Sequence, residues 1–154
     1  MIIYRILSFI VSFFCAFLAM NVLFGIFFAL TEPMALLICF LFACVVLYGW
    51  FANRFFANVV IAKKRMTRKQ KDWLQVNAIV AFIFSLFCII AGIEFFINPG
   101  VVDEVIKQMP AQSAITSKQL MNTFIVFFSF CVSLFIHVIW TYTFIRKNKE
   151  FFDA

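Results

Sequence analysis

KKRMTRKQK, residues 63–71, is the one stretch of this chain in which hydrophilic residues dominate over more than a few positions. It holds six of the thirteen Lys and Arg residues, and very apolar stretches lie on both sides of it. A basic segment between apolar segments is typical of a loop that joins two transmembrane helices. The stretch therefore divides the chain into two apolar halves and fixes the predicted topology.

The composition of the 154-residue chain supports this interpretation. Hydrophobic residues make up 66% of the chain and charged residues 13%, whereas soluble domains contain roughly 45–50% and about 25% of these classes. Twenty-five residues are Phe. So few polar groups cannot cover the surface of a water-soluble domain of this size. We therefore expect lipid to surround most of the chain.

Four apolar stretches are long enough to cross a bilayer, for which a helix needs about 20 residues. Pro33 suits the first position of the second helix, because an N–H group is not needed there. Residues 98–100, Asn-Pro-Gly, end the third stretch. Thr116 followed by Gln119 predicts a capping box before the fourth. The sequence thus predicts one all-α domain over residues 1–154, a four-helix transmembrane bundle with spans at about 3–30, 34–54, 73–97 and 120–145.

Charge sets the predicted orientation of the bundle. Two helical hairpins place both termini on the side of the basic loop (residues 63–72), and that side carries eleven Lys and Arg residues. The opposite, outer side carries only Lys107 and Lys118, both in the loop 98–119. The positive-inside rule then predicts cytoplasmic termini. This pattern suits a bacterial inner (plasma) membrane and is also compatible with a eukaryotic one.

Two further segments are assigned to the membrane interface. Residues 101–109 have apolar and polar side chains on opposite sides of a helix, which predicts a short amphipathic helix on the outer surface. Near the end of the second span, Tyr48, Trp50 and Arg54 are residue types that anchor a helix at the interface.

Small and weakly polar side chains indicate which helix faces point inward, because lipid tails are as apolar as Leu. The fourth span has such a stripe, with Ser129, Ser133, His137 and Thr141; the third has one that includes Asn77 and Ser85, and the first has one that includes Ser8. We expect these side chains to contact neighbouring helices in the interior of the bundle. The alternative is that they line a polar path along the fourth helix.

His137 is the only histidine. A histidine within a span could relay protons or bind a metal. The chain offers neither a second His nor an acid at the same depth, so we expect a neutral His137 that is hydrogen-bonded to a neighbouring helix. The five cysteines form no C-x-x-C pair, and buried Cys usually behaves as a small hydrophobe. No cofactor or metal is predicted.

Two polar residues, Asn21 and Glu94, lie within spans but off these stripes, which makes them candidate contacts with a partner protein or a second copy. The basic loop is assigned to lipid headgroups or to a cytoplasmic partner. Its basic residues are Lys63, Lys64, Arg65, Arg68, Lys69 and Lys71.

No enzyme motif of the nucleotide-binding, hydrolase or metalloprotease type occurs in the chain. Nucleic acid is not an expected partner, because the basic residues adjoin apolar spans. Membrane lipids and another membrane protein, or a second copy of the chain, are the expected partners. The leading hypothesis is a non-enzymatic subunit or accessory of a membrane complex that acts through helix–helix association. The alternative is an oligomeric channel or small transporter. A lipid or quinone enzyme has the weakest basis, since His137 and Glu94 lie in opposite halves of the bilayer.

Overall fold

The computed structural model describes residues 2–30, 32–98, 100–101, 105 and 116–152. The elements follow in the order α1 (Ile2–Ala29), α2 (Pro33–Phe55), the π-helix η1 (Phe56–Ile61), α3 (Arg68–Ile97), α5 (Ser117–Lys147) and the 3-10 helix η2 (Lys149–Phe151). The described residues contain no β-strand, only an isolated bridge between Met66 and Phe152. Four helices are long and apolar enough to cross a membrane. The prediction of an all-helical chain with four such helices is confirmed.

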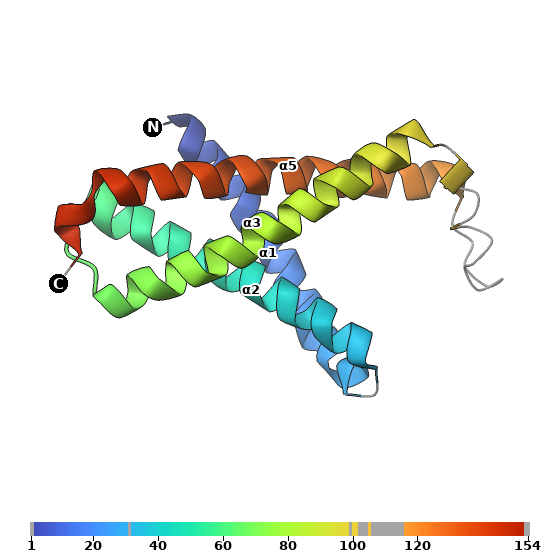
Figure 1. The fold of residues 1–154 in the computed structure, drawn as a ribbon, viewed down its shortest axis with the longest axis horizontal. Coiled ribbons are helices and arrows are strands. Elements are labelled where there is room, and N and C mark those ends of the chain that lie inside the picture. Colours follow the sequence, from blue (N-terminus) through green and yellow to red (C-terminus); the bar gives the residue numbers. More distant parts are fainter. Residues whose placement is uncertain (1, 31, 99, 102–104, 106–115, 153–154) are drawn as a thin grey trace.

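Figure 1 shows these helices as two hairpins, α1 with α2 and α3 with α5, which cross near the middle of the molecule. Both described ends of the chain and the loop at 62–67 lie at one end of the molecule, which we call the basic end. The last turns of α1 and α3 and the first turns of α2 and α5 lie at the other end, which we call the open end because the two hairpins diverge toward it (Figure 1). The most extensive helix contacts follow the cyclic order α1, α2, α3, α5.

Local capping explains where the last two long helices begin. The Thr67 hydroxyl accepts a hydrogen bond from the Gln70 N–H at 3.4 Å, so α3 starts at Arg68 and includes half of the basic stretch. At α5, Thr116 Oγ1 accepts from the Gln119 N–H at 3.3 Å, and Gln119 Oε1 accepts from the Thr116 N–H at 3.0 Å. The predicted capping box is therefore confirmed. The amphipathic segment predicted at 101–109 lies outside the described residues, apart from Val101 and Val105.

Two glycines allow close approach of neighbouring helices. A Cβ atom at Gly49 of α2 would lie 2.6 Å from Cys15 Sγ of α1, and a Cβ atom at Gly92 of α3 would lie 2.2 Å from Phe128 Cδ2 of α5. Any larger residue would have to displace these neighbours. Small residues are typical of helix contacts in membranes, because helices associate there by close packing. Each hairpin thus has a position that only glycine fills without a shift.

At the basic end the loop and the C-terminal segment pack against each other. The Met66 N–H donates to the Phe151 carbonyl at 2.9 Å, and the Met66 side chain is buried. The Lys63 ammonium lies 5.4 Å from the centre of the Phe151 ring, and the Lys71 ammonium lies 5.2 Å from that of Phe152. Such distances allow cation–π attraction. The loop is thereby held to the end of α5.

Candidate functional site

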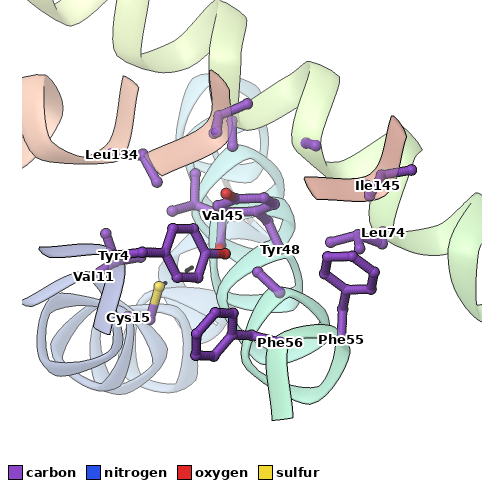
Figure 2. Close-up of a cluster of buried hydrophobic side chains, with 14 of the residues drawn as sticks. Tyr4, Val11, Cys15, Val45, Tyr48, Phe55, Phe56, Leu74, Leu134 and Ile145 are labelled. Atoms are coloured by element: carbon purple, nitrogen blue, oxygen red, sulfur yellow. Dashed lines mark hydrogen bonds between the residues drawn. The ribbon is translucent and has the colours of Figure 1, made fainter. Parts of the chain in front are cut away.

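The most polar part of the interior is a cluster of five buried side chains from three helices: Tyr4, Ser8, Tyr48, His137 and Thr141. We call these five residues the polar cluster. His137 on α5 bonds Ser8 of α1 through Nε2 at 2.9 Å and Tyr48 of α2 through Nδ1 at 2.7 Å. Thr141, one turn from His137, lies 2.9 Å from the Tyr4 hydroxyl and 3.0 Å from the Tyr48 hydroxyl. Figure 2 shows both tyrosines in the core between the helices.

The donors and acceptors of the polar cluster form one consistent set. Thr141 donates its hydroxyl proton to the His137 carbonyl at 2.8 Å, so its oxygen can accept from both Tyr4 and Tyr48. Since Tyr48 then donates to Thr141, it accepts from an Nδ1–H of His137. Nε2 is left to accept from the Ser8 hydroxyl. This assignment, made from the hydrogen-bond network, satisfies a neutral histidine without a charge in the interior.

Aromatic rings cover the polar cluster toward the basic end. The Tyr4 ring stacks on His137 with centroids 4.8 Å apart, and it contacts the rings of Phe56 and Phe144 at 4.6 and 5.0 Å. Among the described residues, no buried side-chain nitrogen or oxygen lacks a hydrogen-bond partner. The same residues contain no group of three or more His, Cys, Asp or Glu placed to hold a metal ion. The polar cluster therefore joins three helices, and each of its side-chain polar atoms has a partner within the bundle.

Apolar side chains close the polar cluster on its other side. Val11, Val45 and Leu134 lie one turn nearer the open end and are almost completely buried. Beyond them, Phe14 of α1 stacks on Phe130 of α5 with ring centroids 4.6 Å apart. A single copy therefore has no continuous polar route from the polar cluster to the open end.

The five residues expected in the bundle interior, or alternatively along a polar path, differ in burial and in bonding. Ser129 is exposed and donates to the Ile125 carbonyl, and Ser133 is half-buried and donates to the Ser129 carbonyl. Asn77 and Ser85 of α3 are buried, and they also bond carbonyls of their own helix, Trp73 and Phe82. Only His137 of the five belongs to the polar cluster.

Two members of the polar cluster were missed in the sequence. Tyr48 was expected at the membrane interface, but it is fully buried, because its hydroxyl finds partners on α5. Tyr4 was not singled out at all. One signal was available: Tyr4 and Ser8 are four residues apart, as are His137 and Thr141, so each pair shares one face of its helix.

Between α1 and α5, on the open-end side of the Phe14–Phe130 pair, lies an apolar groove of about 560 Å³. We call it the open-end groove. Phe side chains form most of its wall, and its polar lining residues are Asn21, Asn122 and Thr123. The groove occupies the region where the hairpins diverge (Figure 1). Its full lining comprises Phe13, Phe14, Phe17, Leu18, Asn21, Phe42, Asn122, Thr123, Val126, Phe127 and Phe130.

The two candidate partner contacts lie on different surfaces. Asn21 lines the open-end groove and donates to the Phe17 carbonyl at 2.8 Å. Glu94 is exposed on α3. It is two residues from Gly92, which contacts α5, so it lies about 200° away around the helix. The structure does not bring Asn21 and Glu94 together.

The basic residues assigned to lipid or to a cytoplasmic partner remain mostly at the surface. Five of the six are exposed and Lys71 is half-buried; the exposed residues are Lys63, Lys64, Arg65, Arg68 and Lys69.

Comparison of the chain with family models, with curated proteins and with solved structures finds no match in any of the three. The function must therefore be argued from the surfaces and cavities themselves.

Proposed function

We propose that this protein is a non-enzymatic subunit of a membrane complex, and that it assembles with further copies of itself through α3. The observation that supports the proposal is a stripe of exposed aliphatic side chains along the whole of α3. We call it the α3 stripe; its members are Val76, Ile79, Ile83, Leu86, Ile90, Ile93 and Ile97.

The spacing of the α3 stripe is that of a heptad repeat, with alternating steps of three and four residues. Such a seam packs knobs into holes when two or more helices run side by side, and in lipid this close packing, not the hydrophobic effect, would drive the association. The stripe lies opposite the buried face of α3, which contains Ala78, Ala81, Ser85 and Gly92. The rest of the bundle therefore leaves it uncovered.

The residue types of the α3 stripe distinguish it from the other exposed faces. Lipid-facing positions elsewhere are rich in Phe, as at Phe9, Phe13, Phe17 and Phe27 of α1. The seven members of the α3 stripe are aliphatic, and all except Leu86 are β-branched; Phe87, which is also exposed, borders the stripe next to Leu86. Isoleucine at both heptad positions favours parallel assemblies of more than two helices. Copies inserted in one orientation would have parallel α3 helices, which suits this pattern.

Charge supports the orientation of the proposed assembly. The basic end has eleven Lys and Arg residues in its loop, tail and flanking turns, so by the positive-inside rule it faces the cytoplasm. We place the protein in a bacterial inner membrane, for which this simple charge pattern is typical. Glu94 follows Ile93 of the α3 stripe, at a position where charged side chains commonly flank a helix seam.

The assembly is tested by native mass spectrometry after mild extraction. Wild type should give a homo-oligomer of defined size, and the double variant Ile83→Phe/Ile90→Phe should give mainly monomer. Overpacking costs about 1–3 kcal/mol per site, so two sites should weaken association roughly tenfold or more. The matched control, Ile6→Phe/Ile26→Phe, changes exposed residues of α1 and should leave the oligomer intact.

Other outcomes of this experiment would count against the proposal. A monomeric wild type would remove the basis for assembly. A partner of different sequence bound to α3 would keep the role of complex subunit but would replace the second copy as the partner.

The alternative function, a channel or small transporter, has weaker support because Ser129 and Ser133 lie outside the polar cluster, which is closed on both sides.

A further inference from the structure

The open-end groove combines a long apolar wall with polar groups at one extremity. Phe13 and Phe130 lie at its inner limit. Asn21 and Asn122, each eight residues nearer the open end, lie at its outer limit. Eight helical residues correspond to about 12 Å. The groove is therefore elongated, apolar along its length and amide-lined at its mouth.

A space of this kind must be filled when the helices lie in a bilayer. Water is unstable in a cavity lined by Phe, Leu and Val, because it finds too few hydrogen-bond partners there. An empty groove would forfeit the dispersion contacts of its wall. A volume of about 560 Å³ is typical of ligand-binding cavities, and such cavities are mostly apolar with a few polar groups. An acyl chain meets these requirements.

The charge near the mouth indicates the type of headgroup. Lys118 is exposed one turn before Asn122 on α5, and residues four apart share a helix face. Lys118 therefore lies beyond the amides, on the side of α5 that borders the groove. Among the residues that the structure describes, no acidic side chain lines the groove. This arrangement suits a negatively charged phosphate outside the amides and an ester-linked chain inside.

We propose that the open-end groove binds one acyl chain of an anionic phospholipid from the leaflet at the open end. The Phe-lined wall holds the chain, Asn21 and Asn122 lie at the depth of its ester group, and Lys118 attracts the phosphate. The site lies between α1 and α5, so it does not depend on the proposed assembly through α3.

The experiment uses delipidated protein in a non-ionic detergent. It is titrated with phosphatidylglycerol or phosphatidylcholine of the same chain length, and bound lipids are counted by native mass spectrometry. The variant Val126→Phe places a larger side chain in the groove at an exposed residue. It should weaken the tightest lipid site at least tenfold. The control Ile136→Phe enlarges an exposed residue of α5 that lines none of the described cavities, and it should bind as wild type does.

We define the groove component as the lipid binding that is lost in Val126→Phe. It does not include lipids bound at the basic end. Within it, phosphatidylglycerol should be preferred about fivefold, the factor that ~1 kcal/mol from one basic residue represents. Lys118→Gln should abolish the preference and Lys118→Arg should restore it. Equal lipid binding by Val126→Phe and Ile136→Phe would overturn the proposal. It would also be overturned if Lys118→Gln left the phosphatidylglycerol preference of the groove component unchanged.

The outcome is separable from that of the proposed assembly. Val126→Phe should keep the wild-type oligomer, because it lies on α5. The Ile83→Phe/Ile90→Phe variant should keep the groove component as a monomer. Loss of the groove component in the Ile83→Phe/Ile90→Phe variant, or loss of the oligomer in Val126→Phe, would contradict the independence of the two sites.

Discussion

At the scale of single residues, Tyr48 is the central member of the polar cluster. Its hydroxyl contacts both His137 and Thr141, whereas the Tyr4 hydroxyl bonds Thr141 and has Ser8 as a second hydrogen-bonding neighbour. Removal of the hydroxyl therefore has different consequences at Tyr48 and at Tyr4. Without Tyr48, the His137 Nδ1–H has no acceptor, but without Tyr4, the Thr141 oxygen still accepts from Tyr48.

We predict that Tyr48→Phe destabilises the protein by about 1–3 kcal/mol, the cost of an unsatisfied buried donor. Tyr4→Phe should cost less, about 0.6 kcal/mol, which is typical of a hydrogen bond between membrane helices. Unfolding in mixed micelles with increasing dodecyl sulfate measures both free energies. Tyr142→Phe is the control, since Tyr142 is partly exposed at 36%. Equal effects of Tyr48→Phe and Tyr4→Phe would contradict the assigned donor and acceptor roles.

The sequence could identify His137 and Thr141 as inward-facing but not their partners. Helical spacing relates residues of one helix, and it contains no information on which turn of α1 or α2 lies at the same height. Tyr4 and Tyr48 are also residue types that suit the membrane interface. Their burial depends on hydrogen-bond partners that only the packed bundle brings within reach.

At the scale of elements, the contact between the loop and the C-terminal segment links α2, α3 and α5. The Phe152 ring stacks on Phe55, the last residue of α2, with centroids 5.8 Å apart. Met66 lies between η1 and α3 and bonds Phe151. Three helix ends are thus fixed by a short segment that follows α5. The sequence predicted a basic loop here but not its attachment, because the loop and the tail are far apart in the chain.

We predict that deletion of residues 149–154 frees the loop. Met66 loses its hydrogen-bond acceptor, and the half-buried rings of Phe151 and Phe152 no longer cover their neighbours. Trypsin should then cleave after the basic residues of the loop several times faster than in wild type. The free energy of unfolding should fall by no more than about 1–3 kcal/mol for each ring removed. Deletion of residues 153–154 alone is the control and should leave cleavage unchanged. Equal cleavage of the two deletion variants would argue against a role of η2 in holding the loop.

At the scale of the whole molecule, hydrophobic length and charge predicted the four helices, because these properties are local. The crossing of the two hairpins is not local. It depends on contacts such as Gly92 against Phe128, and in a chain that is 66% hydrophobic almost any face could serve as a contact. The open-end groove follows from that crossing and therefore could not be predicted from the sequence.

The same arrangement supports the proposed subunit more than the alternative channel. Within one copy, the polar cluster extends no further toward the open end than His137 and Ser8, because Val11, Leu134 and the Phe14–Phe130 pair follow. Between copies, an assembly through the α3 stripe places Ile, Val and Leu on its axis. Both possible routes across the membrane are therefore apolar, and apolar constrictions exclude hydrated ions.

We predict that liposomes containing the purified protein show no more proton or potassium flux than protein-free liposomes, as measured with pH- and potassium-sensitive dyes. An added ionophore should discharge both preparations equally, which controls for their integrity. Flux in wild type that is lost in His137→Leu would instead establish a conducting state that passes through the polar cluster. The side chains of Val11 and Leu134 would then have to move apart, and the transporter hypothesis would replace that of a complex subunit.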